Sequence, residues 1–306
     1  MLSSYGSAST RPTCPACAGS AIRLGPRSRA TGRAIARCGS CGASYWATAD
    51  AASTEVVSEA DMSGEDLADW VDIKRPESGP EAWRATTARL RSACPGTEAP
   101  LLYDVGAGDG SYLAVARDEF GFRVGGNEIV AAAIDVARER HEVTLDLGDL
   151  GALGHDGDID AITMWCVLAH VPDADQLLHD VRAALRPGGV LFLQTPRRTV
   201  ADRAAQWVQR ASGGRLSRIA DRRIAEHHSI LHTERSITAQ LGRAGFTDVR
   251  TEPVARYSLQ SRAYLASMNP PDWTLGPASW LMDRAVASPA APRIVLDAYA
   301  RRPLTG

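Results

Sequence analysis

The stretch over residues 101–112 constrains the fold more than any other part of the chain. It reads Leu-Leu-Tyr-Asp-Val-Gly-Ala-Gly-Asp-Gly-Ser-Tyr, so an apolar run ends in an acid and three glycines follow at alternate positions. This order predicts a β-strand, a tight turn and the start of a helix. Because glycine has no Cβ, it lets a backbone turn sharply and approach a ligand closely. The stretch is therefore typical of a nucleotide-binding turn in an open α/β sheet.

Each residue of this turn has a predicted task. Gly106 turns the chain off the strand, and Gly108 and Gly110 let the backbone approach a ligand. Asp104 stands at the carboxyl end of the strand, where open α/β sheets bind their ligands. A dinucleotide fingerprint needs its third glycine one position later, where this chain has Ser111. The spacing thus indicates a different nucleotide cofactor.

A second acid follows the next predicted strand, over residues 122–128. Glu128 ends that strand, and a carboxylate there can accept hydrogen bonds from both ribose hydroxyls of a nucleoside. A helix is predicted after it, over residues 131–140. We therefore predict Glu128 as the second anchor of the cofactor.

The third and fourth predicted strands, over 143–147 and 159–165, supply the remaining cofactor candidates. After the third strand, Asp149 can accept a hydrogen bond from an adenine amino group, while Leu150 packs the ring and offers a backbone N–H. The neighbouring acids Asp146 and Asp156 are alternatives to Asp149. Trp165, the last residue of the fourth strand, completes the predicted cofactor set.

Length and charge limit the organisation of the chain. At 306 residues it can bury one large core and carry a smaller module besides. The net charge of −2 gives no general attraction to nucleic acid or membranes. No apolar run approaches the roughly 18 residues that span a bilayer, and the first 20 residues have no hydrophobic signal core. We expect a cytoplasmic protein.

The small module is predicted from cysteine spacing. Two Cys-x-x-Cys pairs with 20 residues between them occur near the start of the chain. Each pair lets one tight turn direct two thiolates at one ion, and two such turns complete the four-sulfur shell that zinc favours. Short strands are expected over 22–24 and 34–37. The predicted zinc ligands are Cys14, Cys17, Cys38 and Cys41.

These features divide the chain into three predicted parts. Residues 1–49 form a disordered leader and the zinc ribbon. Residues 50–99 form a helical connector, with helices over 63–70 and 80–90, that covers the mouth of the next domain. Residues 100–306 form the large α/β domain, which carries a helical insertion at about 201–232 over the carboxyl edge of its sheet. Its last two strands are predicted over 248–256 and 293–301.

Three further motifs carry a family resemblance. They are Cys166-Val-Leu-Ala-His-Val-Pro-Asp173, Arg186-Pro-Gly-Gly189 and Arg37-Cys-Gly-Ser-Cys-Gly42. Together with the glycine turn, they resemble the bacterial class I S-adenosylmethionine-dependent methyltransferases that begin with a four-cysteine zinc ribbon; Ala169 stands where that family usually has Glu. The resemblance implies a doubly wound Rossmann-like sheet with a reversed last strand. It also implies S-adenosylmethionine and Zn²⁺ as cofactors and a small biosynthetic metabolite as acceptor.

Two histidines are the candidate catalytic bases. Methyl transfer needs the acceptor in line with the methyl group and, for some acceptors, the loss of a proton. His170 follows the fourth strand, and His228 is in register with a histidine of the resembling family. Histidine suits proton transfer because its unperturbed pKa is near neutral. For each of them a purely structural role is the alternative.

Residues 201–225 are rich in arginine, which favours an acceptor bearing a carboxylate or a phosphate. On this hypothesis, replacing Arg222 and Arg223 with Gln raises the KM for the acceptor. An RNA base methyltransferase is the alternative suggested by the basic ribbon, although the overall charge makes nucleic acid a less favoured partner. A non-catalytic binding protein that keeps the cofactor fold is the alternative of a different class.

Overall fold

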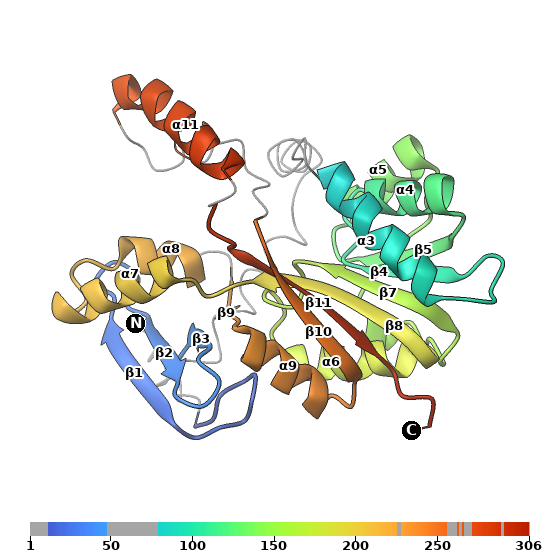
Figure 1. Ribbon diagram of the computed structural model, residues 1–306, viewed down its shortest axis with the longest axis horizontal. Helices are drawn as coiled ribbons and strands as arrows, with labels where there is room; N and C mark the ends of the chain where they lie inside the picture. Colours follow the sequence, from blue (N-terminus) through green and yellow to red (C-terminus); the bar gives the residue numbers. More distant parts are fainter. Residues whose placement is uncertain are drawn as a thin grey trace, which may run out of the picture.

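A large sheet and a small sheet stand side by side in the structure, a computed structural model (Figure 1). The predicted leader and the predicted helix over 63–70 lie outside the residues that it describes. Those described are 12–47, 79–224, 228–255, 262, 265, 271–288 and 291–305.

The large sheet has seven strands in the order β10-β11-β8-β7-β4-β5-β6. Neighbouring strands from β8 to β6 run parallel, whereas β11 runs antiparallel to both β8 and β10. This confirms the predicted doubly wound sheet with a reversed last strand. The strands are β4 (Leu101–Val105), β5 (Arg123–Glu128), β6 (Asp146–Leu147), β7 (Ile159–Trp165), β8 (Leu185–Pro196), β10 (Thr247–Val254) and β11 (Val295–Arg301).

The chain order reverses direction between β4 and β7. From β4 the chain adds β5 and β6 on one side, and it then returns to add β7 and β8 on the other. Open α/β sheets bind ligands at such a switch point, outside the carboxyl ends of the strands. The glycine turn that follows β4 lies at this place.

Helices cover both faces of the large sheet (Figure 1). The apolar residues of α3, α4 and α5 form one core with one face, and those of α6 and α9 form a second core with the other. The helices are α3 (Gly79–Ala93), α4 (Ser111–Phe120), α5 (Ala131–His141), α6 (Ala174–Ala184) and α9 (Glu234–Arg243). A further helix, α11 (Asp272–Ala287), projects from the body of the molecule.

One predicted strand has different bounds in the structure, because the strand predicted over 143–147 pairs with β5 only at Asp146 and Leu147. Strand β8 begins at Leu185, so it contains the Arg186–Gly189 motif. A register shift in the β7–β8 pairing accommodates this Pro-Gly-Gly segment within the strand.

The small sheet is the ribbon, and the large domain completes it. Three of its strands, β1 (Ile22–Arg27), β2 (Ala34–Cys38) and β3 (Ser44–Trp46), come from the predicted ribbon. The fourth, β9 (Ile230–Leu231), pairs antiparallel with β3 and comes from the large domain. The ribbon is therefore built into the larger fold by backbone hydrogen bonds.

The two faces of the ribbon sheet have different neighbours. Ala36 and Tyr45 pack on the face that holds the four cysteines, together with Ala169. Ile35 and Trp46 point to the other face, where they pack against α8. Two helices, α7 (Val200–Ala211) and α8 (Arg218–Ile224), make up the predicted insertion.

The insertion was expected to lie directly over the carboxyl edge of the large sheet, and this is corrected. Its helices begin beyond the carboxyl end of β8, but α7 packs against β1 and α8 packs against β9. The reason is apolar contact, because Ala220 and Ile224 are buried against the ribbon.

Candidate active site

The glycine turn after β4 has the left-handed backbone conformation that a tight glycine turn requires. Gly106, Gly108 and Gly110 have φ values of +69°, +57° and +72°, a region that favours glycine. The N–H groups of Gly106 and Ala107 both donate to the carbonyl oxygen of Asn127, at 3.0 Å. The turn after β4 is thus fastened to the end of β5.

The three glycines differ in what surrounds them. A Cβ added to Gly106 would lie 2.7 Å from Val167 Cγ2, on the loop after β7. A Cβ on Gly108 would meet no atom within 4 Å, so this glycine borders open space. A Cβ on Gly110 would lie 2.9 Å from the Cβ of Ala137 on α5. The missing Cβ of Gly110 thus permits helix packing, and its role in ligand approach stays a prediction.

Glu128 lies beside the glycine turn. Its Oε2 accepts a hydrogen bond from the Gly108 N–H at 2.8 Å. Its Oε1 accepts from the N–H groups of Ile129 at 2.7 Å and Val130 at 3.1 Å. These three bonds fix the carboxylate at the carboxyl end of β5, next to the one turn glycine that borders open space.

Asp104 is buried below the turn. The hydroxyl of Thr163 on β7 donates to its Oδ1 at 2.5 Å. Burial, assisted by the charge of Glu128, raises the pKa of this carboxyl to about 8, although the Thr163 hydrogen bond opposes the shift. Thr163 was not singled out from the sequence, because contact between adjacent strands depends on their register.

The remaining predicted cofactor residues follow β6 and β7. Asp149 is exposed and precedes the short helix η2 (Leu150–Ala152). The side chain of Leu150 is buried in the main core, so little of its surface is open to an adenine ring. Trp165 is half-buried and contacts Tyr112 edge-on, with 5.0 Å between the ring centres. The cofactor roles of all three stay predictions.

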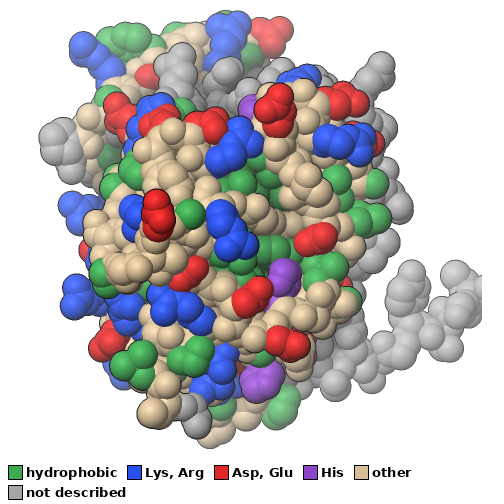
Figure 2. Space-filling view, turned by 90° about the vertical axis from the view of Figure 1, so that its right-hand side faces the viewer, with side chains coloured by type: hydrophobic (Ala, Val, Ile, Leu, Met, Phe, Trp, Pro, Cys, Tyr) green, Lys and Arg blue, Asp and Glu red, His purple; other side chains and the backbone are tan. Residues whose placement is uncertain are grey.

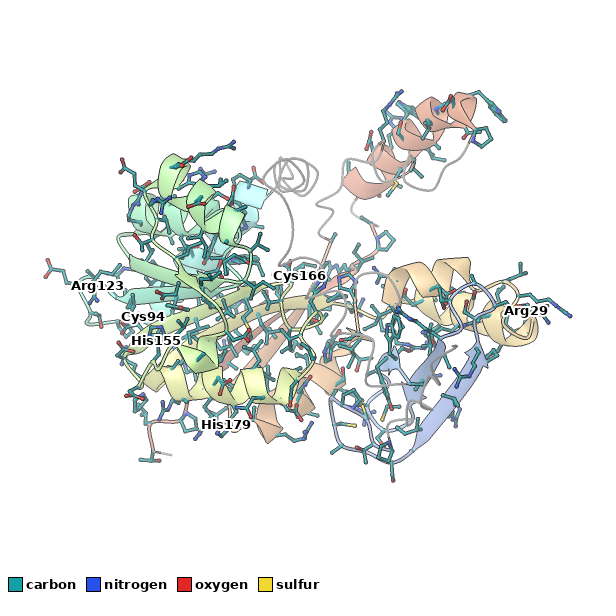
Figure 3. All side chains as sticks on the ribbon, turned by 180° about the vertical axis from the view of Figure 1, so that it is seen from behind. Arg29, Cys94, Arg123, His155, Cys166 and His179 are labelled. Carbon is teal, nitrogen blue, oxygen red and sulfur yellow. The ribbon has the colours of Figure 1, made fainter. Side chains whose placement is uncertain are left out.

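The loop after β7 links the large sheet to the ribbon. Cys166 has a φ of +65°, which is unusual for a residue with a Cβ, and its N–H donates to the Gln194 carbonyl oxygen at 3.2 Å. In Figure 3 it lies between the large sheet and the ribbon, whereas Cys94, His155 and His179 lie at other parts of the large domain. Ala169 is fully buried in the ribbon core. A glutamate at this position would bury its charge among the cysteines.

The two candidate bases, His170 and His228, are brought together at this edge. Their ring centres lie 4.9 Å apart. The backbone around His228 is held by the ribbon and by the loop: Trp46 Nε1 donates to its carbonyl oxygen at 3.2 Å, and the Ser229 N–H donates to the carbonyl oxygen of Ala169 at 2.8 Å. Contact between residues so distant in the chain was not predicted.

A third histidine, His232, is structural. It is completely buried and its Nδ1 lies 3.0 Å from the Ser236 hydroxyl. Burial lowers the pKa of its imidazole to about 3. It therefore stays neutral, and its carbonyl oxygen accepts a hydrogen bond from the Arg198 N–H at 2.7 Å.

Residues 77–251 match the sequence pattern of a protein family whose description is methyltransferase domain. The match covers more than half of the chain. The chain belongs to the methyltransferase-domain family. Its sheet order and reversed last strand are those of the class I S-adenosylmethionine-dependent methyltransferases, as the sequence predicted.

Curated relatives agree with this assignment. The methyltransferase is 32% identical over 143 residues to a ubiquinone biosynthesis O-methyltransferase of Xanthomonas campestris, a match that covers 43% of this chain and 58% of the relative. It is 33% identical over 108 residues to the enzyme of the same name from Actinobacillus pleuropneumoniae, covering 32% of this chain and 46% of the relative. The chain thus spans about half the length of the curated relatives that it matches.

A solved structure shares the fold. Haemonchus contortus phosphoethanolamine N-methyltransferase 2, in complex with phosphomonomethylethanolamine and S-adenosylhomocysteine, superposes with a TM-score of 0.54. The match covers 81% of this chain and 59% of that one, at 16% sequence identity.

Among the described residues of the methyltransferase, no helix is both long enough and apolar enough to cross a membrane.

The four cysteines of the methyltransferase converge as predicted. Their sulfur atoms all lie within 4.8 Å of one another, and the Cys14–Cys41 and Cys17–Cys38 pairs are each separated by 3.6 Å. Zn–S bonds of about 2.3 Å in a tetrahedron would place two sulfurs about 3.8 Å apart. The donor set and its spacing therefore fit zinc.

The cysteine thiols act on one another. The hydrogen bond between Cys14 and Cys41 lowers the pKa of the Cys14 thiol and raises that of the Cys41 thiol, and burial raises the pKa of the Cys17 thiol. Tyr45 packs beside the cluster, where burial and the nearby sulfur charges raise the pKa of its phenol.

One predicted acceptor-binding arginine has a structural role instead. Arg223 Nε donates to Asp202 Oδ1 at 2.8 Å, and its Nη2 donates to the Arg197 carbonyl oxygen at 2.9 Å. Asp202 is 5% exposed, so this ion pair joins α8 to α7 inside the protein. The side chain of Arg222 lies outside the described part of the chain.

Proposed function

We propose that the protein transfers a methyl group from S-adenosylmethionine to a small biosynthetic metabolite. The observation that carries this proposal is the contact between the glycine turn and Glu128, with Gly108 N–H and Glu128 Oε2 2.8 Å apart. It places a fixed carboxylate beside a glycine that borders open space, at the switch point of the sheet. Matches to ubiquinone biosynthesis O-methyltransferases support an acceptor of metabolite size.

The cofactor would be held by residues from three strand ends. In this proposal the turn over 104–110 surrounds its amino-acid end, Glu128 accepts from its ribose hydroxyls, and Asp149, Leu150 and Trp165 border its base. When bound, S-adenosylmethionine supplies an electrophilic methyl group on its sulfonium. The protein then has to align the acceptor and, where required, take up its proton.

One histidine of the pair at the carboxyl edge would take that proton. His170 and His228 lie 4.9 Å apart between ring centres, so either can face an acceptor bound at this edge. Replacement of the active base with Gln should lower kcat more at low pH than at high pH, where an acceptor loses its proton without help. Equal rates for wild type, His170→Gln and His228→Gln at every pH would remove this part of the proposal.

We also propose that Cys14, Cys17, Cys38 and Cys41 bind one structural Zn²⁺. The support is a buried four-sulfur donor set with spacings close to a tetrahedral shell. A module as small as the ribbon buries little apolar surface, so metal ligation would supply much of its folding free energy.

Calorimetry with S-adenosylmethionine tests the cofactor assignment. Wild type should bind it, Glu128→Gln should bind at least about tenfold more weakly because charged hydrogen bonds are lost, and the exposed Glu139→Gln should match wild type. Absence of binding by wild type would overturn the proposal and favour a non-catalytic binding protein. Incubating metabolite extracts and RNA with isotopically labelled cofactor then separates a metabolite acceptor from an RNA base.

A further inference from the structure

A cluster of arginines lies where the ribbon sheet, the end of β8 and helix α7 meet. Arg198 follows β8, and its Nε donates to the Ser44 hydroxyl of β3 at 2.8 Å. Its Nη2 and the Ser44 hydroxyl both lie 3.3 Å from Gln206 Oε1 on α7. The guanidinium is thus held in place by two neutral side chains, and neither of them balances its charge.

Three more arginines adjoin this one. Arg37 lies directly opposite Ser44 in the β2–β3 pairing, so the two side chains share a face of the ribbon. Arg203 and Arg210 stand three residues before and four residues after Gln206, hence on the same face of α7. We define the arginine cluster by its four members, Arg37, Arg198, Arg203 and Arg210.

The cluster has no acidic partner among the described residues. Every ion pair found there that involves an arginine uses an arginine outside the cluster. The nearby acid, Asp202, has its oxygens occupied by Arg223 and by the N–H and hydroxyl of Thr199. The Nε atom of Arg37 is buried, and no described residue forms a hydrogen bond with it.

The four charges of the cluster act on one another at Arg198. Burial, together with the charges of Arg37, Arg203 and Arg210, lowers the pKa of its guanidinium to about 10, although the charge of Asp202 opposes this shift. On the side of the molecule opposite the ribbon, by contrast, arginine and acidic side chains are interspersed (Figure 2). Arg37 and Arg198 are partly buried, whereas Arg203 and Arg210 are exposed. An anion bound here would offset the desolvation of the two partly buried charges and the repulsion among all four.

We propose that the arginine cluster binds a phosphoryl group of the methyl acceptor. Guanidinium groups match phosphate oxygens with paired hydrogen bonds, and several around one site favour a doubly charged anion over a single carboxylate. Backbone contacts join the cluster to the segment that follows the candidate base His228, because the Arg198 N–H donates to the His232 carbonyl oxygen and Ser44 pairs with Leu231. The acceptor assignment rests on the proposed function, whereas anion binding by the cluster does not.

Calorimetry with inorganic pyrophosphate, inorganic phosphate and succinate tests the site. The variant is the double replacement Arg203→Gln and Arg210→Gln, which changes two exposed side chains. The control is Arg140→Gln with Arg215→Gln, which removes two exposed charges elsewhere. Wild type and control should bind pyrophosphate most tightly, and the variant about tenfold more weakly, because charge-assisted hydrogen bonds are lost.

Three results would overturn the inference. The first is that wild type does not bind pyrophosphate. The second is that variant and control lose pyrophosphate affinity equally. The third is that wild type binds a short RNA more tightly than pyrophosphate and the same variant loses that RNA binding. S-adenosylmethionine binding is measured on the same samples. If it is normal while pyrophosphate fails, the inference alone falls; if wild type binds pyrophosphate and not the cofactor, the proposed function falls instead.

A labelling experiment tests the link to the acceptor. Metabolite extract is separated by anion exchange, and each fraction is incubated with labelled S-adenosylmethionine and enzyme. Wild type and control should label the retained, anionic fraction, and the Arg203→Gln, Arg210→Gln variant should label it at least about fivefold less at limiting extract. Label confined to the unretained fraction would refute the acceptor assignment.

Discussion

Replacing Gly108 with Ala separates ligand approach from backbone strain. Gly108 has a φ of +57°, and an added Cβ would meet no protein atom within 4 Å. Gly121, which ends α4, is a matched control, because its φ is +69° and an added Cβ there also meets nothing within 4 Å. The two positions differ in only one relevant respect, namely that Gly108 lies beside Glu128 in the proposed cofactor site.

The expected costs follow from this match. Holding an alanine in the left-handed region costs about 1–2 kcal/mol, so both Gly108→Ala and Gly121→Ala should lose stability by a similar amount. Only Gly108→Ala places a methyl group where the cofactor is proposed to lie. Its affinity for S-adenosylmethionine should therefore fall by roughly tenfold to a hundredfold, as overpacking a binding surface costs about 1–3 kcal/mol.

Urea unfolding measures the loss of stability in each variant, and calorimetry measures its affinity for S-adenosylmethionine. The reasoning holds if the two variants lose equal stability while only Gly108→Ala loses cofactor affinity. It fails if Gly108→Ala binds the cofactor as tightly as Gly121→Ala, since the open space beside Gly108 would then not be cofactor space.

Three further predictions concern pH, metal and the ribbon contact. Burial raises the pKa of Asp104 from 3.8 to about 8, so between these two pH values the folded protein keeps a proton there that the unfolded chain releases. The stability that this group contributes is therefore present below about pH 4 and is lost as the pH rises to about 8. Asp104→Asn should flatten that fall in the free energy of unfolding, measured with urea. Co²⁺ should give thiolate-to-metal absorption that saturates at about one ion per chain, which Cys38→Ser abolishes and Cys94→Ser preserves; loss in both variants would contradict the assigned ligands. Ala169→Glu buries a charge in the ribbon core and should lower the free energy of unfolding by about 3–5 kcal/mol, whereas Glu at the exposed Ala204 should change it little; equal effects would contradict the contact.

The glycine turn and its contact with the second strand could be anticipated from the sequence because both are encoded locally. The glycine turn and Glu128 each follow a strand with a clear apolar pattern, and parallel strands bring their carboxyl ends to one edge. The cysteine pairs are equally local, since two residues between thiols suffice to form each knuckle. Packing added one constraint that the sequence did not indicate, because an added Cβ on Gly110 would contact Ala137 of α5.

The sequence by itself therefore determined the sheet, the glycine turn and the pairing of the cysteines in two Cys-x-x-Cys turns, all of which depend on short spacings. Only the tertiary structure decided that β9 joins the ribbon, that Ala169 is buried beside the cysteines, and that Arg198 meets Ser44. These contacts join segments far apart in the chain, and no periodicity records which distant surfaces will pack together. The arginine cluster has the same origin, because its members come from the ribbon, from the residues after β8 and from α7, and become neighbours only when those elements meet.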